Sequence, residues 1–298
     1  MDVSPEETVA KAIEDILAIL DFDVKAKLDI TGTKAALTAM VKEAQVLQFK
    51  MVLKDLNAHL QANGIDIATL EGSTSSFLGS VRFMQATALR DWNTNKGSQI
   101  SPGKTVCEVG FNAGHSALLW LLAGVTRVIS FELGKHKYSQ LANEWLSARF
   151  PGKLHVVMGD SSQTVPTFHT MFPKEKCDIV FVDGGHTSRQ AWDDLTHFKD
   201  LVDLGRNTSN GHILLVDDTN MPGVREAWAQ VQSQGIAVED GQIFSNNADV
   251  NDFPFSSDLR WIGNFVTESP GAIKWWDWQG KLSYGRYLPD AARNPDPN

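Results

Sequence analysis

Short apolar segments alternate with amphipathic segments from about residue 104 onward, and this alternation is the strongest pattern in the chain. The apolar segments have the length of β-strands and fall at 105–110, 127–132, 153–160, 177–183 and 212–218. Helical periodicity lies between and after them, at 114–124, 135–149, 161–171, 187–203 and 221–234. Nearly all-apolar strands alternating with helices are typical of a parallel sheet that is covered on both faces. We therefore expect an α/β fold with a doubly wound, Rossmann-like sheet.

Helical periodicity dominates the first 100 residues. A long helical pattern in this region stops at Asn63-Gly64, which is a good C-terminal signal for a helix. We expect residues 1–100 to form an N-terminal helical lead-in or lid, and residues 101–298 to form the main domain. The N-terminal helices also offer a surface through which two copies of the chain could pair.

The C-terminal part of the chain has the pattern of antiparallel additions to the sheet. Residues 260–266, RWIGNFV, are the best strand candidate within 236–298. We expect an antiparallel strand here, on the substrate side of the sheet. The segment near 71–95 and this C-terminal part should determine substrate specificity, but neither identifies the substrate.

Composition and charge narrow the class of partner. The formal net charge of −9 argues against a nucleic-acid surface, which normally needs clustered Lys and Arg. No apolar stretch approaches the roughly 20 residues that span a bilayer, and the acidic N-terminus lacks a signal-peptide pattern. We expect a cytoplasmic protein that acts on a small molecule, in which Cys107 and Cys177 are buried, reduced thiols.

A glycine-containing turn follows the first predicted strand. Gly110 and Gly114 allow a tight turn and close approach of a ligand, and a helix N-terminus follows them. The second strand ends in Glu132, which could accept hydrogen bonds from two vicinal ribose hydroxyls of NAD or of S-adenosylmethionine. The turn lacks the denser glycine motif that the NAD pyrophosphate requires, which favours S-adenosylmethionine. Asp160 and Ser161, after the third strand, could bind an adenine edge.

Five segments of the chain resemble class I S-adenosylmethionine-dependent methyltransferases in their order and spacing. These segments are TVCEVGFNAGHSALLWLL, FELGKHKYSQLANEWL, LHVVMGDSSQTVP, CDIVFVDGGH and GHILLVDD. The resemblance is closest to the catechol O-methyltransferase-like and macrolide sugar O-methyltransferase-like groups. It covers about 104–234, and the regions on either side match only in outline.

The resemblance implies roles for individual residues in binding the cofactor. The implied cofactor-binding residues are Glu108, Gly110, Asn112, Gly114, Ser116, Glu132, Asp160, Ser161 and Asp183. Among them, Glu108 and Gly110 would border the methionine portion, and Ser116 would lie near its carboxylate. We expect His115, in the same segment, to cap the helix or to face solvent.

Three acids end neighbouring strands of the predicted sheet. Asp183 ends the fourth strand, and Asp217 and Asp218 end the fifth, so their carboxylates should converge at one edge. Converging carboxylates repel, so either one is protonated or a cation neutralises them. All-oxygen ligands suit Mg²⁺, and the catechol-type enzymes that this chain resembles bind a divalent cation at the matching positions. We therefore expect Asp183, Asp217 and Asp218 to bind Mg²⁺ or another divalent cation.

His186 follows Asp183 at the start of a predicted helix. A helix N-terminus disfavours the imidazolium, so His186 should be neutral and able to accept a proton. We expect metal-assisted O-methylation of a hydroxyl on a small metabolite, with His186 and Asp183 as the catalytic residues. Two alternatives stay open, a metal-free N- or carboxyl-methyltransferase and an NAD-dependent oxidoreductase. A non-catalytic binding subunit is a further reading, which the complete set of motifs disfavours.

Overall fold

A computed structural model describes the central domain and part of the N-terminal lead-in. The described residues are 48–49, 51–70, 104–122, 124–204, 212–244 and 281–289. The predicted strand at 260–266 and the predicted specificity segment near 71–95 lie outside them. The division between residues 1–100 and 101–298, and the role of the lead-in as a lid, remain predictions.

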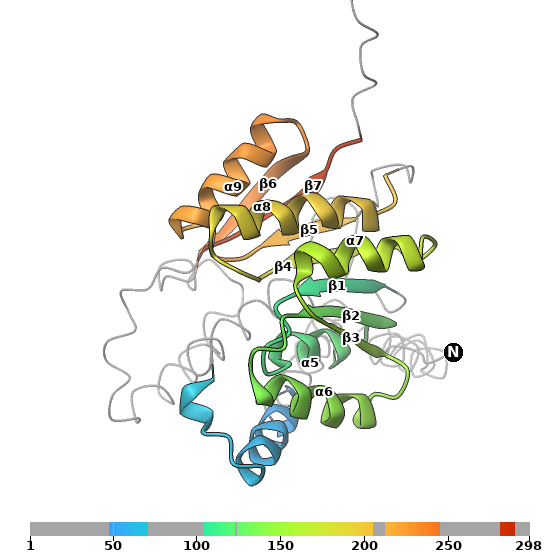
Figure 1. The fold of residues 1–298 in the computed structure, drawn as a ribbon, viewed down its shortest axis with the longest axis vertical. Helices are drawn as coiled ribbons and strands as arrows, with labels where there is room; N and C mark the ends of the chain where they lie inside the picture. The colour runs from blue at the N-terminus through green and yellow to red at the C-terminus, as the bar shows by residue number, and fades with distance from the viewer. Residues whose placement is uncertain are drawn as a thin grey trace, which may run out of the picture.

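A seven-stranded sheet in the order β3-β2-β1-β4-β5-β7-β6 forms the centre of the molecule (Figure 1). The strands are β1 (Thr105–Val109), β2 (Arg127–Glu132), β3 (Leu154–Met158), β4 (Ile179–Val182), β5 (Ile213–Val216), β6 (Ala237–Phe244) and β7 (Lys281–Tyr287). The first five strands pair in parallel, and β7 is antiparallel to both of its neighbours. The expected doubly wound sheet with an antiparallel strand near the C-terminal part is confirmed.

The helices fall where the apolar periodicity predicts them. They are α5 (His115–Leu122), α6 (Lys137–Arg149), α7 (Ser161–Met171), α8 (Ser188–His197) and α9 (Pro222–Ser233), with 3-10 turns η1 (Ile67–Thr69) and η2 (Phe198–Leu201). The pattern predicted a single helix over 187–203, but η2 replaces its last part with a tighter turn. No helix in the described part of the chain is long and apolar enough to cross a membrane.

Two apolar layers bury opposite faces of the sheet. Successive residues of a strand point to opposite faces, so Val106 joins the layer with α5 and α6, and Cys107 joins the layer with α7, α8 and α9. Figure 1 shows α5 and α6 on one side of the sheet and α7 to α9 on the other. Burial on both faces explains why the strands are almost wholly apolar.

The described part of the N-terminal lead-in shares the core of the α5–α6 layer. Residues 51–62 are helical, and Leu56 and Leu60 from this helix are fully buried in that layer. The helix ends as predicted, where Asn63 donates from Nδ2 to the carbonyl of His59 at 2.9 Å and Gly64 takes a φ of 80°.

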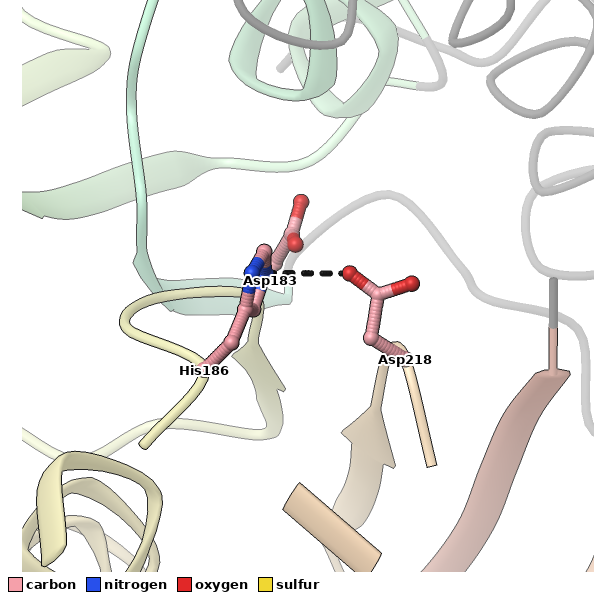
Figure 2. Close-up of side chains that lie close together, drawn as sticks. All are labelled: Asp183, His186 and Asp218. Carbon is pink, nitrogen blue, oxygen red and sulfur yellow. Dashed lines mark ion pairs between the residues drawn. The ribbon is translucent and has the colours of Figure 1, made fainter. Parts of the chain in front are cut away.

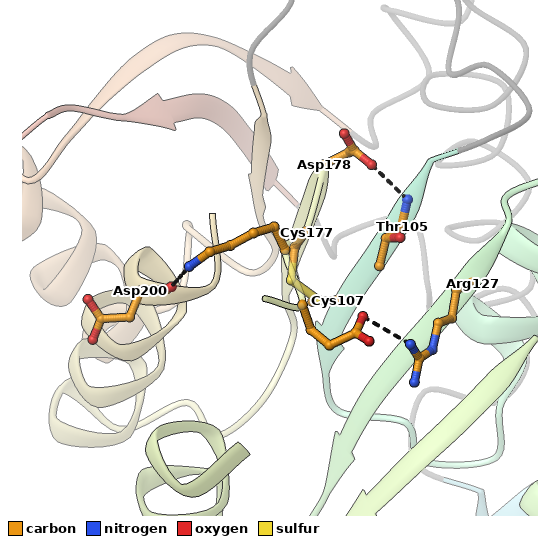
Figure 3. The surroundings of a disulfide bond; sticks show 8 residues. Thr105, Cys107, Arg127, Cys177, Asp178 and Asp200 are labelled. Carbon is orange, nitrogen blue, oxygen red and sulfur yellow. Dashed lines mark hydrogen bonds and ion pairs between the residues drawn. A yellow bond between two sulfur atoms is a disulfide. The ribbon is translucent and has the colours of Figure 1, made fainter. Parts of the chain in front are cut away.

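A disulfide joins Cys107 of β1 to Cys177, which precedes β4 (Figure 3). The expectation of two reduced thiols was wrong. Because β4 pairs directly with β1, the two Cα atoms lie 5.7 Å apart, within the separation that a disulfide requires. The bond lies at the end of β4 opposite to Asp183, so it ties the two central strands together away from the acids.

Removing the disulfide should destabilise the chain substantially. The two cysteines are 70 residues apart, and a cross-link of this span stabilises by up to about 4 kcal/mol in the chain-entropy model. We expect the double variant Cys107→Ala and Cys177→Ala to lose a free energy of unfolding of this order in urea titrations. A reductant should lower the stability of the wild type toward that of the variant and leave the variant unchanged. Equal wild-type stability with and without the reductant would contradict the prediction.

Candidate functional site

The candidate site lies at the carboxyl ends of β1, β4 and β5. Strand β1 lies between β2 and β4, so the chain leaves β1 toward one edge of the sheet and returns to its other side with β4. Ligands of doubly wound sheets bind at this reversal of strand order, outside the carboxyl ends of the strands. The predicted site residues follow these strands.

Gly110 is required by the close approach of the loop after β4. Its φ is 96°, and a Cβ atom at this position would lie 1.9 Å from the carbonyl oxygen of Asp183. Gly114 has a φ of 75°, and a Cβ there would lie 2.6 Å from Cδ1 of Leu146. Both glycines therefore allow close packing within the fold as well as the predicted turn.

Glu132 organises the loop that follows β1. It is 7% exposed, and its two carboxylate oxygens accept from the backbone N–H groups of Asn112 at 2.7 Å and Gly134 at 3.0 Å. Each oxygen has a second lone pair, which leaves capacity for two hydroxyl donors. Asn112 takes a φ of 52° and makes this contact through its backbone N–H.

Two apolar side chains beside Glu132 were missed by the sequence interpretation. Leu133 follows it directly and is 61% exposed, and Met158 at the end of β3 is 40% exposed. Large apolar side chains exposed at strand ends provide a surface for a flat aromatic ligand group. The signals in the sequence were Leu133, directly after the predicted strand 127–132, and Met158, near the end of the predicted strand 153–160.

Glu108 lies beneath the glycine turn and is completely buried. Burial raises the pKa of Glu108 from 4.5 to about 7, while hydrogen bonds from Ser130, Ser116 and Trp120 oppose that rise. The Ser130 hydroxyl donates to Oε1 of Glu108 at 2.6 Å. Glu108 and Ser116 are thus neighbours, and Glu108 lies below the surface of the site.

Asp160 and Ser161 begin α7 at the carboxyl end of β3. The Asp160 carboxylate caps the helix by accepting from the N–H of Ser162 at 3.0 Å. Ser161 hydrogen-bonds to the carboxyl group of Asp194 in α8. Asp194 is only 2% exposed, although it is a carboxylate on a helix. Burial raises its pKa from 3.8 to about 7.

His115 contacts the N-terminal lead-in. Its Nε2 lies 3.1 Å from Oδ1 of Asn57, and burial lowers the pKa of His115 from 6.5 to about 4. The expectation that His115 caps the helix or faces solvent was therefore wrong. This residue links the start of α5, beside the glycine turn, to the helix at 51–62.

The three acids after β4 and β5 converge as predicted. The N–H of Asp183 donates to Val109 at 3.1 Å and the N–H of Asp217 donates to Val182 at 3.0 Å, so both residues continue the parallel ladder. Burial first, and then the charges of Asp217 and Asp218, raise the pKa of Asp183 well above its ordinary value. Burial and Asp218 also raise the pKa of Asp217 from 3.8 to about 7.

His186 faces Asp218 across the mouth of the site (Figure 2). Its Nε2 lies 3.1 Å from Oδ2 of Asp218, and the two side chains are 50% and 16% exposed. One ligand atom each from Asp183, His186 and Asp218 lies within 4.8 Å of the others. Within the described residues this group contains His186 and does not contain Asp217, whose Oδ1 accepts from the N–H of Asp218 at 2.9 Å.

This arrangement can support two kinds of chemistry. A histidine paired with a carboxylate can act as a general base, because the carboxylate orients the imidazole and stabilises the charge that it gains. Two carboxylates and an imidazole nitrogen at these separations can also bind a divalent cation. The raised pKa values of Asp183 and Asp217 have the direction that crowded carboxylates produce without a nearby cation.

Comparison with known families identifies the central segment. Residues 107–219 match the family described as "Methyltransferase domain". This segment runs from β1 to just beyond β5 and contains every candidate site residue named above. The match confirms the resemblance to methyltransferases for this segment. The sequence matches no curated protein.

Solved structures with related folds come from several organisms. An O-methyltransferase from Bacillus cereus in complex with SAH is 11% identical, has a TM-score of 0.47, and the match covers 84% of this chain and 96% of that one. A provisionally named O-methyltransferase from Klebsiella pneumoniae is 14% identical and has a TM-score of 0.47. That match covers 80% of this chain and 90% of the Klebsiella chain. A provisionally named RNA methyltransferase from Pyrococcus horikoshii is 20% identical and has a TM-score of 0.36. That match covers 48% of this chain and 64% of the Pyrococcus chain.

Replacing Asp194 with asparagine should change how stability depends on pH. The raised pKa means that the folded chain binds the proton more tightly than the unfolded chain, so Asp194 destabilises the fold increasingly from about pH 4 to pH 7. Asparagine cannot ionise, so Asp194→Asn should gain stability over the wild type across this range, by up to about 4 kcal/mol. Urea titrations at several pH values measure the difference. The exposed Asp55→Asn is the control, and a difference between Asp194→Asn and the wild type that stays constant with pH would contradict the prediction.

Proposed function

We propose that this methyltransferase domain uses S-adenosylmethionine to methylate a hydroxyl group of a small molecule, with His186 as the general base. The observation that carries the proposal is the pair formed by His186 and Asp218 beside Asp183. This pair lies at the strand ends where the glycine turn approaches the loop after β4.

The charge of the site favours S-adenosylmethionine over NAD. Asp183 is close enough to interact electrostatically with Glu108, Asp217 and Asp218, and Glu132 lies next to the glycine turn. S-adenosylmethionine carries a positive sulfonium and a positive ammonium group, whereas the pyrophosphate of NAD carries two negative charges. The acids would attract the first cofactor and repel the second.

Other side chains at the strand ends suit the ribose and the adenine of S-adenosylmethionine. The lone pairs left on Glu132 would accept from the two ribose hydroxyls. Leu133 and Met158, both exposed beside it, would pack against the adenine ring, and Asp160 and Ser161 would lie at its edge.

His186 would remove the hydroxyl proton of the substrate. In the tautomer that donates from Nε2 to Asp218, the lone pair of the neutral imidazole is on Nδ1, which would accept the proton. The substrate oxygen would then form a bond to the methyl carbon while the carbon–sulfur bond breaks, and the electron pair would leave with sulfur as a neutral thioether. Asp218 would stabilise the imidazolium that results.

A divalent cation fits the same residues. Asp183 and Asp218 would hold it, with His186 as a third donor, and the crowding of these carboxylates supports the fit. When bound, a divalent cation makes a coordinated hydroxyl more acidic. The carboxylates also suit a substrate ammonium group, which supports N-methylation as the second candidate function.

Cofactor choice can be tested by ligand-induced stabilisation. We expect S-adenosylmethionine to raise the melting temperature of the chain and NAD to leave it unchanged, because only a ligand that binds the folded state stabilises it. Glu132→Gln should weaken S-adenosylmethionine binding about tenfold or more, since an amide cannot accept at both positions. Glu144→Gln, on the exposed face of α6, is the matched control. Stabilisation by NAD alone would support an oxidoreductase instead.

Loss of the base should abolish turnover without loss of the cofactor. We expect His186→Ala to lower turnover by about 10²- to 10⁴-fold and Asp218→Asn to lower it less, with little change in S-adenosylmethionine affinity. Release of S-adenosylhomocysteine from a panel of phenols, sugars, amines and carboxylic acids measures turnover, and product mass spectra identify the methylated atom. His169→Ala, near the end of α7, serves as the control.

The same assay separates the candidate mechanisms. Turnover that disappears in EDTA and returns with Mg²⁺ would support the cation. Turnover unchanged after metal stripping would support His186 and Asp218 acting alone. Near-normal turnover in His186→Ala would overturn the assignment of the base, and methylation confined to amines would favour the second candidate function.

A further inference from the structure

Gly223 lies where a side chain would collide with the backbone that carries His186. It is the second residue of α9, and a Cβ atom there would lie 2.3 Å from the carbonyl oxygen of His186 and 2.8 Å from the backbone nitrogen of Ser188. Both are backbone atoms, which cannot rotate away as the end of a flexible side chain can. The first turn of α9 therefore approaches the start of α8 as closely as a glycine permits.

The conformation of Gly223 does not itself require glycine. The φ of Gly223 is not positive, and the residue lies in the first turn of a regular helix. In a helix interior, alanine is favoured over glycine by about 1 kcal/mol. The reason for glycine at this position is therefore the space taken by the backbone of His186.

The start of α9 is also hydrogen-bonded to the backbone of Asp218. The N–H of Met221 donates to the carbonyl of Asp218 at 2.7 Å, and the N–H of Arg225 donates to Met221 at 2.9 Å. Asp218 itself takes a φ of 54°, a left-handed conformation that few residues other than glycine adopt readily. A short segment thus touches the backbone of His186 through Gly223 and the side chain of His186 through Asp218.

The other side of His186 is fixed by α8. Thr187 is the N-cap of this helix. Its hydroxyl oxygen accepts from the backbone N–H of Gln190 at 3.3 Å, and the hydroxyl donates to Oε1 of the Gln190 side chain at 2.7 Å. His186 is thus held between a capped helix start and the first turn of α9. A shift of either helix start would therefore change the distance between His186 and Asp218.

We propose that Gly223 is a positioning residue, which sets the distance between His186 and Asp218 by allowing α9 to pack against the backbone of His186. Its effect on catalysis rests on the proposed function of His186, but its effect on the geometry of the pair does not. A side chain at this position must displace either α9, with Asp218, or the segment that carries His186.

Gly223→Ala tests the proposal with three measurements on the full chain. The imidazole ¹⁵N signals of His186, assigned by their loss in His186→Ala, should shift at a fixed pH. S-adenosylmethionine affinity should change less than about threefold, because Glu132 ends β2, and β1 and β4 separate β2 from β5, the strand that precedes α9. Turnover should fall about 10- to 100-fold, as expected when a catalytic group is misplaced by about 1 Å.

Three further variants keep the result interpretable. Glu226→Ala, on the exposed side of α9, should change none of the three measurements. In the His186→Ala background, Gly223→Ala should cause no further loss of turnover, since its effect passes through His186. If Gly223→Ala does not fold, Pro222→Gly loosens the same turn, and the His186 signals should then shift or broaden.

The outcomes separate this proposal from the proposed function. Unchanged His186 signals in a folded Gly223→Ala, or in Pro222→Gly where the alanine variant does not fold, would overturn the positioning role. Additive losses of turnover in the double variant would overturn it as well. Shifted signals together with normal turnover in His186→Ala would leave the positioning role standing and remove His186 as the base.

Discussion

Parallel pairing of β4 with β1 on one side and β5 on the other is the constraint on which the site depends. Val109 is opposite Val182, and Val182 is opposite Val216, so the next residue of each strand arrives at the same edge. Gly110, Asp183 and Asp217 are therefore brought side by side by the sheet itself. Glycine is required at position 110 because the Asp183 carbonyl occupies the place where a side chain would begin. The acids lie close together at this edge although their negative charges repel.

Crowding of acids has an energetic cost that the rest of the fold must offset. The raised pKa values of Glu108, Asp183 and Asp217 mean that ionisation of these groups is less favourable in the folded chain than in water. The left-handed backbone at Asp218 adds a local strain of the order of 1–3 kcal/mol. The two apolar layers and the disulfide supply compensating stability away from the strand ends, where side chains remain available to ligands.

Apolar periodicity was sufficient to predict the main elements, because strands buried on both faces and amphipathic helices differ clearly in pattern. The convergence of Asp183 with Asp217 and Asp218 also followed, since parallel strands end at the same edge. The inclusion of His186 in the compact group, in place of Asp217, depended on the turn at Asp218 and could not be read from residue spacing.

Other features of the site depended on contacts between elements that are distant in sequence. The burial of Asp194 follows from which face of α8 packs toward α7, and the contact between His115 and Asn57 from where the lead-in helix docks. Gly223 gave no signal in the sequence, because a glycine in the first turn of a helix has many ordinary explanations. Its role becomes visible only when α8 and α9 are side by side.

The disulfide has a topological consequence for the chain as a whole. The bond between Cys107 and Cys177 closes a covalent ring that includes α5, β2, α6, β3 and α7, so two whole strands of the sheet and the candidate nucleoside-binding residues lie inside it. A protease that cut one peptide bond within this ring would leave a single covalent molecule. The two pieces would separate only after reduction, and until then β1 and β4 would stay tethered as neighbours.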